Sequence, residues 1–123
     1  MEKDLKDKKI LIVDDDIDSR LYLKVILGKF NTNITAVSNG CESIEILKKE
    51  NFDIILMDVY MPCMNGISCV KCIREKLSIT TPIIIITAGI MELHNDILPI
   101  VNKCIQKPFS PSTLIDTVKN CIL

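Results

Sequence analysis

The sequence lacks the features that direct a protein to a membrane or to nucleic acid. Its 123 residues carry a formal net charge of −1, which gives no general attraction to nucleic acid or to an anionic membrane. No apolar run approaches the roughly 20 residues that span a bilayer. The apolar run after the charged start MEKDLKDKK is too short for a signal peptide. We therefore expect a cytoplasmic protein that neither inserts into a membrane nor binds nucleic acid directly.

The cysteines offer little to a metal ion or to disulfide chemistry. Only Cys69 and Cys72 have the CxxC spacing of a metal or redox site. A structural zinc ion would need a second such pair, which the sequence does not contain. The cysteines stand mostly beside apolar residues, so we interpret them as reduced thiols that act as small hydrophobic side chains.

The sequence also has a single histidine, His94, in an irregular stretch. Phosphohistidine domains carry their histidine on a helix of a bundle. We therefore interpret His94 as a surface residue and not as a phosphate carrier.

Apolar runs alternate with helical patterns along the whole chain, and hydrophobic residues make up 48% of it. We found no internal repeat or linker, so we expect one domain over residues 1–123. The apolar runs predict strands at residues 9–13, 34–37, 52–58, 83–87 and 104–106. Helical spacing, as of Ile17, Leu21 and Val25, predicts helices at residues 17–28, 41–50, 67–75 and 111–122.

Near-continuous apolar strands separated by helices indicate a parallel sheet that is covered on both faces. Right-handed crossovers make this a doubly wound α/β fold, in which ligands collect beyond the carboxyl ends of the strands. In this sequence those ends carry Asp14 and Asp15, Asp58, Thr87 and Lys107. One edge of the sheet should thus gather acids, a hydroxyl and an ammonium.

This set of groups suits a divalent cation and a phosphoryl group. Clustered carboxylates attract a hard cation, and a site that keeps several waters suits Mg²⁺. Such a cation neutralises charge as a phosphoryl group moves, and a lysine adds a compact positive charge. An aspartate held in line can act as the nucleophile and form an acyl phosphate. The acids Asp14 to Asp16 therefore follow a buried strand because a cation is expected to neutralise them.

Four segments, ILIVDDD, ILMDVYMPCMNG, IIIITA and QKPF, resemble in order the signatures of response-regulator receiver domains of two-component signalling. The resemblance covers residues 9–122. It implies a flavodoxin-like five-stranded sheet in the order 2-1-3-4-5 and phosphotransfer from a sensor histidine kinase or phosphotransfer protein. It also implies a switch that signals to a downstream protein. Such a domain is no enzyme in the usual sense, since it catalyses only its own phosphoryl transfer and autodephosphorylation.

The resemblance assigns the phosphoacceptor and the metal ligands. Asp58 matches the acceptor, which also contacts the metal ion. Asp14 and Asp15 match the acidic pair, with Asp15 bound to Mg²⁺ directly and Asp14 mostly through water. The main-chain carbonyl of Tyr60 matches the third protein ligand.

Three further positions carry the switch and the phosphate contacts of the family. Thr87 matches the switch hydroxyl, and Ala88 the small residue needed where the phosphate sits close. Lys107 matches the family's lysine, whose bond to the following proline, here Pro108, is cis. Asp16 and Asp18, in contrast, are expected only to favour the first turn of the helix through its dipole.

The same residues are compatible with other functions. Asp14 and Asp16 satisfy the Asp-x-Asp motif of haloacid-dehalogenase-type hydrolases, but the segment after Lys107 and the short chain do not fit that family. A degenerate receiver that only binds partners is disfavoured because every required group is present. A stand-alone regulator and a receiver module of a hybrid histidine kinase both remain open.

The sequence departs from the family where output is usually made. Cys104 replaces the aromatic residue that commonly stands three positions before the lysine, and it has too little area to transmit the same packing change. Pro99 disfavours helical geometry at Leu98. We expect a short or broken helix in this region, and a partner that reads the local ordering of residues 89–103. The alternative is recognition through the first helix.

Overall fold

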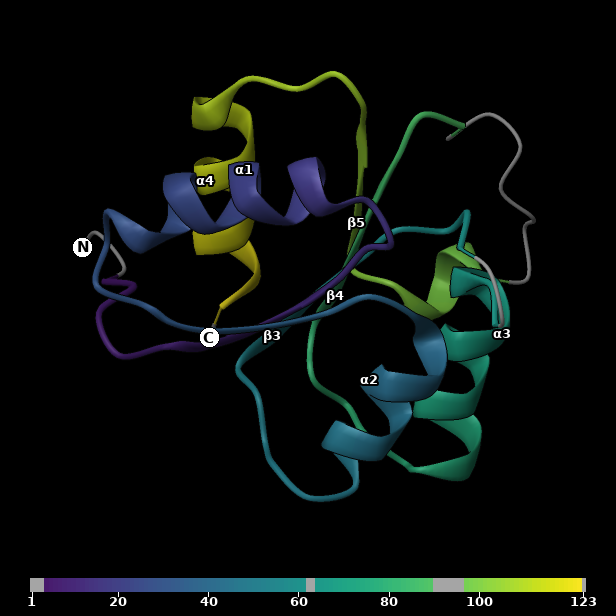
Figure 1. Cartoon of the computed structure of the whole chain (residues 1–123). Helices are drawn as coiled ribbons and strands as arrows, with labels where there is room; N and C mark the ends of the chain where they lie inside the picture. The colour runs from purple at the N-terminus through teal and green to yellow at the C-terminus, as the bar shows by residue number, and fades with distance from the viewer. Residues whose placement is uncertain (1–3, 62–63, 90–96, 123) are drawn as a thin grey trace.

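In the computed structural model, parallel strands form one sheet between two layers of helices (Figure 1). The structure describes residues 4–61, 64–89 and 97–122. The strands are β1 (Lys9–Val13), β2 (Asn33–Val37), β3 (Ile54–Met57), β4 (Ile83–Thr87) and β5 (Lys103–Gln106). Their order is β2-β1-β3-β4-β5 and every adjacent pair is parallel, which confirms the predicted fold class and strand order.

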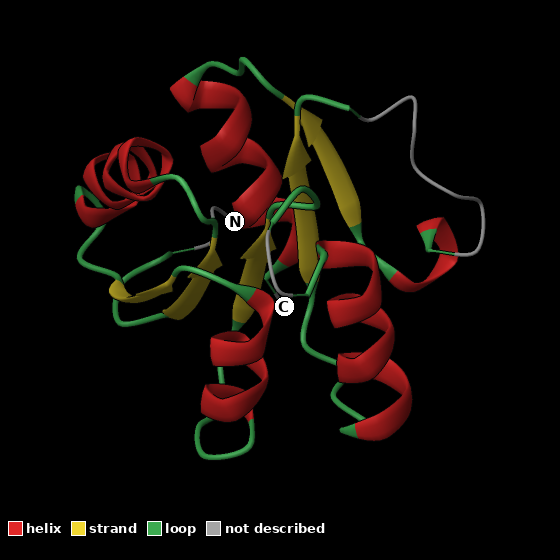
Figure 2. Cartoon of the chain, turned by 45° about the vertical axis from the view of Figure 1, so that its right-hand side comes forward, coloured by secondary structure: helices red, strands yellow, loops and turns green. Residues whose placement is uncertain are grey.

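The helices lie on both faces of the sheet, as Figure 2 shows from a second side. They are α1 (Ile17–Gly28), α2 (Gly40–Leu47), α3 (Gly66–Lys71) with its π-helical continuation η1 (Cys72–Lys76), the 3₁₀ turn η3 (Leu98–Ile100) and α4 (Pro111–Cys121). The helices predicted at residues 17–28, 41–50, 67–75 and 111–122 are present, although α2 ends at Leu47, three residues before the expected end. No helix among the described residues is long and apolar enough to cross a membrane.

The central strands are apolar at consecutive positions because each of their faces meets a different layer of helices. Ile10 and Ile12 of β1 pack into the core beneath α1 and α4, while Leu11 and Val13 pack beneath α2 and α3. All four side chains are fully buried. A strand at this place in the sheet therefore cannot alternate apolar and polar residues, which explains the apolar run at residues 10–13.

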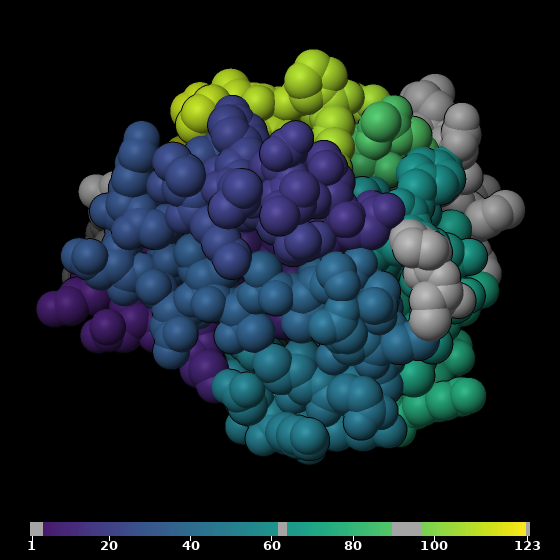
Figure 3. All heavy atoms as spheres, viewed as in Figure 1, coloured from purple at the N-terminus to yellow at the C-terminus, as the bar shows by residue number. Residues whose placement is uncertain are grey.

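The buried side of α1 differs from the side that the apolar spacing picked out. Leu23, Ile26 and Leu27 are buried, whereas Ile17, Leu21 and Val25 are 60%, 51% and 61% exposed. Helix α1, purple to blue in Figure 3, lies on the surface that this view presents. The spacing of apolar residues thus identified the helix correctly but not which side of it faces the core.

The segment before β5 is tied to the end of the third helix by one guanidinium. Arg74 donates hydrogen bonds of 2.7 to 2.8 Å to the carbonyls of Ile79, Thr81 and Ile100. Leu98–Ile100 forms a single 3₁₀ turn. The expected short helix falls mostly on residues 90–96, which include His94. These residues lie outside the described part of the chain.

Candidate functional site

Strand register brings two aspartates together at one edge of the sheet. Val13 of β1 is paired with Met57 of β3, so Asp14 and Asp58 follow the ends of two adjacent strands. The Asp58 amide donates to the carbonyl of Val13 at 2.9 Å, which extends the ladder by one bond. The two carboxylates therefore emerge side by side because the strands below them are in register.

Asp15 completes a group of three carboxylates. One oxygen from each of Asp14, Asp15 and Asp58 lies within 4.8 Å of the others. Asp14 is only 2% exposed, while Asp15 is exposed. Oxygen donors at this spacing, one of them open to solvent, fit Mg²⁺, which prefers carboxylates and retains several waters. The chemistry of the donor set thus agrees with the expected cation.

Lys107, directly after β5, supplies the positive charge at the same edge. Its Nζ lies 3.1 Å from Asp14 Oδ2 and 3.5 Å from Asp58 Oδ2. Its amide donates to the carbonyl of Thr87, and the Lys107–Pro108 bond is cis, as the resemblance implied. The ammonium therefore lies between the two carboxylates that the register of β1 and β3 places side by side.

Burial and neighbouring charges shift the pKa values of Asp58 and Lys107. Burial raises the pKa of Asp58; the positive charge of Lys107 opposes that shift, and the negative charge of Asp14 adds to it. Burial by itself would lower the pKa of Lys107, but its hydrogen bonds and ion pairs with Asp14 and Asp58 raise it overall. Lys107 is thus held in its charged form, while Asp58 is held less firmly in its ionised form.

Thr87 and Ala88 lie at the end of β4, the strand beside β3, and Tyr60 follows Asp58 after β3. Thr87 is fully buried and its Oγ1 accepts a hydrogen bond of 3.3 Å from the Gly89 amide. Ala88 is exposed beside the site, where its carbonyl accepts a hydrogen bond from Gln106. The Tyr60 amide donates to Asp58 Oδ1 at 3.3 Å. These positions agree with the expected arrangement, whereas their functional roles stay predictions.

The Tyr60 ring lies against Gly89. A Cβ atom added to Gly89 would be 2.7 Å from the Tyr60 hydroxyl oxygen and 2.9 Å from its ring. Real Cβ atoms do not approach other atoms so closely, so glycine at this position allows the ring to rest where it does. The sequence showed both residues but gave no sign that they touch.

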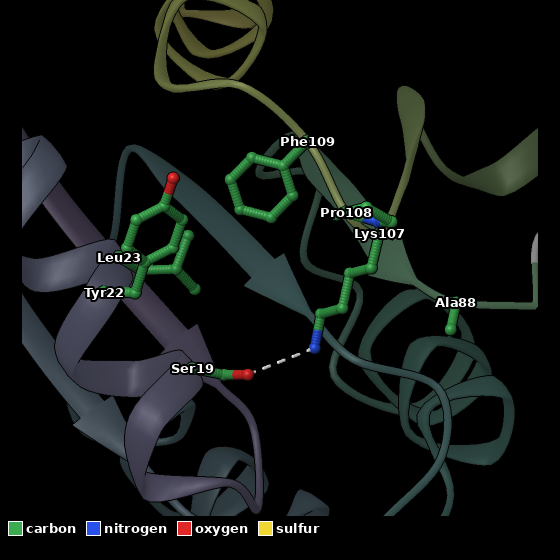
Figure 4. Close-up of a pocket in the computed structure, with 7 residues that line it drawn as sticks. All are labelled: Ser19, Tyr22, Leu23, Ala88, Lys107, Pro108 and Phe109. Carbon is green, nitrogen blue, oxygen red and sulfur yellow. Dashed lines mark hydrogen bonds between the residues drawn. The ribbon is translucent and has the colours of Figure 1, made fainter.

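A pocket of about 470 Å³ opens beside Lys107, between α1 and the segment that leads to α4 (Figure 4). It is lined by Ser19, Tyr22, Leu23, Ala88, Lys107, Pro108 and Phe109. The rings of Tyr22 and Phe109 are 5.8 Å apart between centroids. Ser19 was not among the site residues predicted from the sequence. The one feature of the sequence that could have pointed to it is its position a helical turn after the acid cluster.

The CxxC pair lies apart from this site. Cys69 is buried with its sulfur 3.0 Å from Ser43 Oγ, and burial raises the pKa of its thiol to about 11. Metal ions bind the thiolate, so this environment disfavours a metal site. The geometry supports the interpretation of Cys69 as a small core residue.

Most of the chain is similar to proteins of known family. The family model described as "Response regulator receiver domain" matches residues 10–119. The chain is 36% identical over 110 residues to the autoinducer 2 sensor kinase/phosphatase LuxQ of Vibrio vulnificus (strain YJ016), covering 88% of the chain and 13% of LuxQ. It is 38% identical over 113 residues to the transcriptional regulatory protein ResD of Bacillus subtilis (strain 168), covering 90% of the chain and 46% of ResD. The chain thus spans less than half the length of either relative.

Solved structures give the same result. The response regulator TrrA of Thermotoga maritima, in complex with Mg²⁺ and BeF, is similar with a TM-score of 0.86 and 28% identity, over 94% of this chain and 99% of that one. The chemotaxis protein CheY4 of Vibrio cholerae has a TM-score of 0.82 and 29% identity, also over 94% and 99% of the two chains.

The charges around Asp58 predict how its carboxyl titrates in the metal-free protein. We expect a pKa above that of an ordinary aspartate, a further rise in Lys107→Met, where the opposing positive charge is lost, and a fall in Asp14→Asn, where the repulsion is lost. Carbon-detected NMR of the side-chain carboxyls measures all three. Lys119→Met, a charge change on α4, is the control. An Asp58 pKa that stays the same or falls in Lys107→Met would contradict the assignment of these charges.

Proposed function

Because the chain belongs to the response regulator receiver domain family, we propose that Asp58 accepts a phosphoryl group from a histidine of a sensor kinase or phosphotransfer protein. The observation that carries this proposal is the convergence of Asp14, Asp15 and Asp58 around a site that Lys107 also enters. Asp58 is the member that closes the third strand, and it is the carboxylate matched to the acceptor in the family.

In the transfer step, an ionised oxygen of Asp58 attacks the phosphorus atom. A phosphorus–oxygen bond forms, the phosphorus–nitrogen bond of the donor breaks, and the imidazole leaves with the electron pair of that bond. Lys107 offers its positive charge to the phosphoryl oxygens as the negative charge is redistributed. The Asp58–Lys107 distance of 3.5 Å supports this role, because the ammonium is already beside the acceptor.

Asp14, Asp15 and the Tyr60 main-chain carbonyl, together with Asp58, would hold Mg²⁺. When bound, the ion supplies the positive charge that lets three acids and a phosphoryl group share one site. The chain's own contribution is to place the donors: Asp14 is fixed at the end of β1, where its Oδ1 accepts a hydrogen bond of 2.9 Å from the Asp16 amide. Strand register fixes Asp58.

Thr87 and Ala88 carry the response to phosphorylation in this proposal. The Thr87 hydroxyl donates a hydrogen bond to the phosphoryl group, and the small Ala88 leaves room for that group. Since Thr87 Oγ1 is bonded to the Gly89 amide, a turn of the hydroxyl towards Asp58 changes the start of the segment after β4. A downstream protein in the cytoplasm reads that change, and the chain itself does not bind nucleic acid directly.

The chain acts as a phosphoacceptor that catalyses its own loading and autodephosphorylation. Its relatives include a sensor kinase and a transcriptional regulator, each much longer than the matched segment. The same acceptor chemistry serves a stand-alone regulator and a receiver module of a hybrid kinase, so the proposal holds for both.

Labelling with acetyl phosphate in the presence of Mg²⁺ tests the acceptor. We expect wild type to gain the mass of one phosphoryl group on Asp58, and Asp58→Asn to gain none, because the amide is no nucleophile. Asp53→Asn, which changes an exposed aspartate before the same strand, should be labelled like wild type. Full labelling of Asp58→Asn would contradict the proposal, and label on Asp14 would favour a hydrolase of the haloacid dehalogenase type.

Because of the Tyr60 ring, we expect the phosphoryl group on Asp58 to be lost slowly by hydrolysis. The ring is expected to shield the acyl phosphate from water, and Gly89, which has no side chain beyond hydrogen, positions no water there. Tyr60→Ala should lose the label several-fold faster, and Gly89→Ala should also lose it faster because its Cβ displaces the ring. Tyr60→Phe keeps the ring and is the control. Decay can be followed by mass spectrometry, and slower decay in Tyr60→Ala would count against shielding.

A further inference from the structure

We propose that Ser19 is a positioning residue for Lys107: its hydroxyl holds the ammonium between Asp14 and Asp58. This inference rests on the proposed phosphoacceptor function, and it adds a residue of α1 to the groups that make the site work. Figure 4 shows the Ser19 hydroxyl and the Lys107 ammonium pointing towards each other from α1 and from the end of β5.

The distances account for every hydrogen-bond donor of the lysine. Lys107 Nζ lies 3.1 Å from Asp14 Oδ2, 3.5 Å from Asp58 Oδ2 and 3.4 Å from Ser19 Oγ. A lysine ammonium has three N–H groups. Three acceptors from three separate segments thus fix its position, and Ser19 is the one among them that bears no charge.

A second contact strengthens Ser19 as an acceptor. The Ser19 hydroxyl donates its proton to Asp16 Oδ2 at 3.0 Å, so its oxygen faces Lys107 with lone pairs only. A hydroxyl that donates to a carboxylate is a better acceptor, because hydrogen bonds in a chain polarise one another. Asp16 caps α1 by accepting a hydrogen bond from the Asp18 amide. The first turn of α1 and the lysine are thereby joined through one serine.

The distances from the Lys107 ammonium to the two carboxylates are unequal. Asp14 is closer to the ammonium than Asp58 is, and Asp14 is almost fully buried. Without the third acceptor, the ammonium is free to settle on Asp14 and leave the acceptor side. Ser19 adds a third hydrogen bond that holds the ammonium from α1. Because the hydroxyl is neutral, it releases the ammonium to an incoming phosphoryl group more readily than a third carboxylate would.

The first experiment compares the rate of Asp58 phosphorylation by acetyl phosphate among Ser19 variants. We expect Ser19→Ala to be slower by about fivefold, the effect of losing one hydrogen bond of ordinary net strength. Ser19→Thr keeps the hydroxyl and should restore the rate. In a Lys107→Ala background, Ser19→Ala should have no further effect, since the group that the serine positions is absent.

A matched pair of charge changes separates the role of Asp16 from a general effect on the helix. Asp16→Asn preserves a good capping residue but removes the charge that polarises Ser19, so it should slow phosphorylation by less than Ser19→Ala does. Asp18→Asn removes an exposed charge from the same turn and should leave the rate unchanged. Equal slowing by Asp16→Asn and Asp18→Asn would point to the helix dipole and overturn this link.

A second experiment does not depend on phosphotransfer. In the metal-free protein, nitrogen-15 NMR should show the Lys107 ammonium signal in wild type and in Ser19→Thr, and a weakened or exchange-broadened signal in Ser19→Ala. If wild type accepts no phosphoryl group at Asp58, the proposed function fails, and the ammonium signal still decides this inference. An unchanged signal in Ser19→Ala, or an equal rate loss in the Lys107→Ala background, would overturn it.

Discussion

The ion pairs of Lys107 with Asp14 and Asp58 are the interaction on which the site depends. Two carboxylates side by side repel each other, and both are largely buried, with side chains 3% and 12% exposed. A buried charge is costly unless a partner of opposite sign and hydrogen bonds compensate it. The ammonium provides that compensation in the protein alone, and a bound cation would share it. The fold therefore carries an electrostatic cost at this edge of the sheet, which a bound cation would relieve.

Much of this arrangement could be predicted from the sequence, because strand ends are visible in it. The apolar runs before Asp14 and Asp58 located β1 and β3, and parallel strands have their carboxyl ends at one edge. The resemblance to receiver domains implied the sheet order, which the structure confirms. Predictions of this kind succeed because burial on both faces leaves a continuous apolar signature that ends abruptly at the site.

Other features depend on contacts that no local pattern encodes. Ile17, Leu21 and Val25 have the same helical spacing as a buried stripe, yet the packing of α1 on the sheet buries Leu23 and Ile26 instead. The contact of Ser19 with Lys107 joins residues 88 positions apart in the chain. These contacts arise from how the elements pack together, so they became apparent only in the structure.

Calorimetric titration of the metal-free protein with Mg²⁺ tests the central claim most directly, namely that the acids at the strand ends form one cation site with Lys107 as its competitor. The account predicts a single binding event that Asp15→Asn weakens by more than about tenfold, since even outer partners of a metal site change affinity by about that factor. It also predicts tighter binding of Mg²⁺ in Lys107→Ala, where the ammonium no longer forms ion pairs with Asp14 and Asp58. Folded wild type that binds no Mg²⁺, or binding that neither substitution alters, would contradict it.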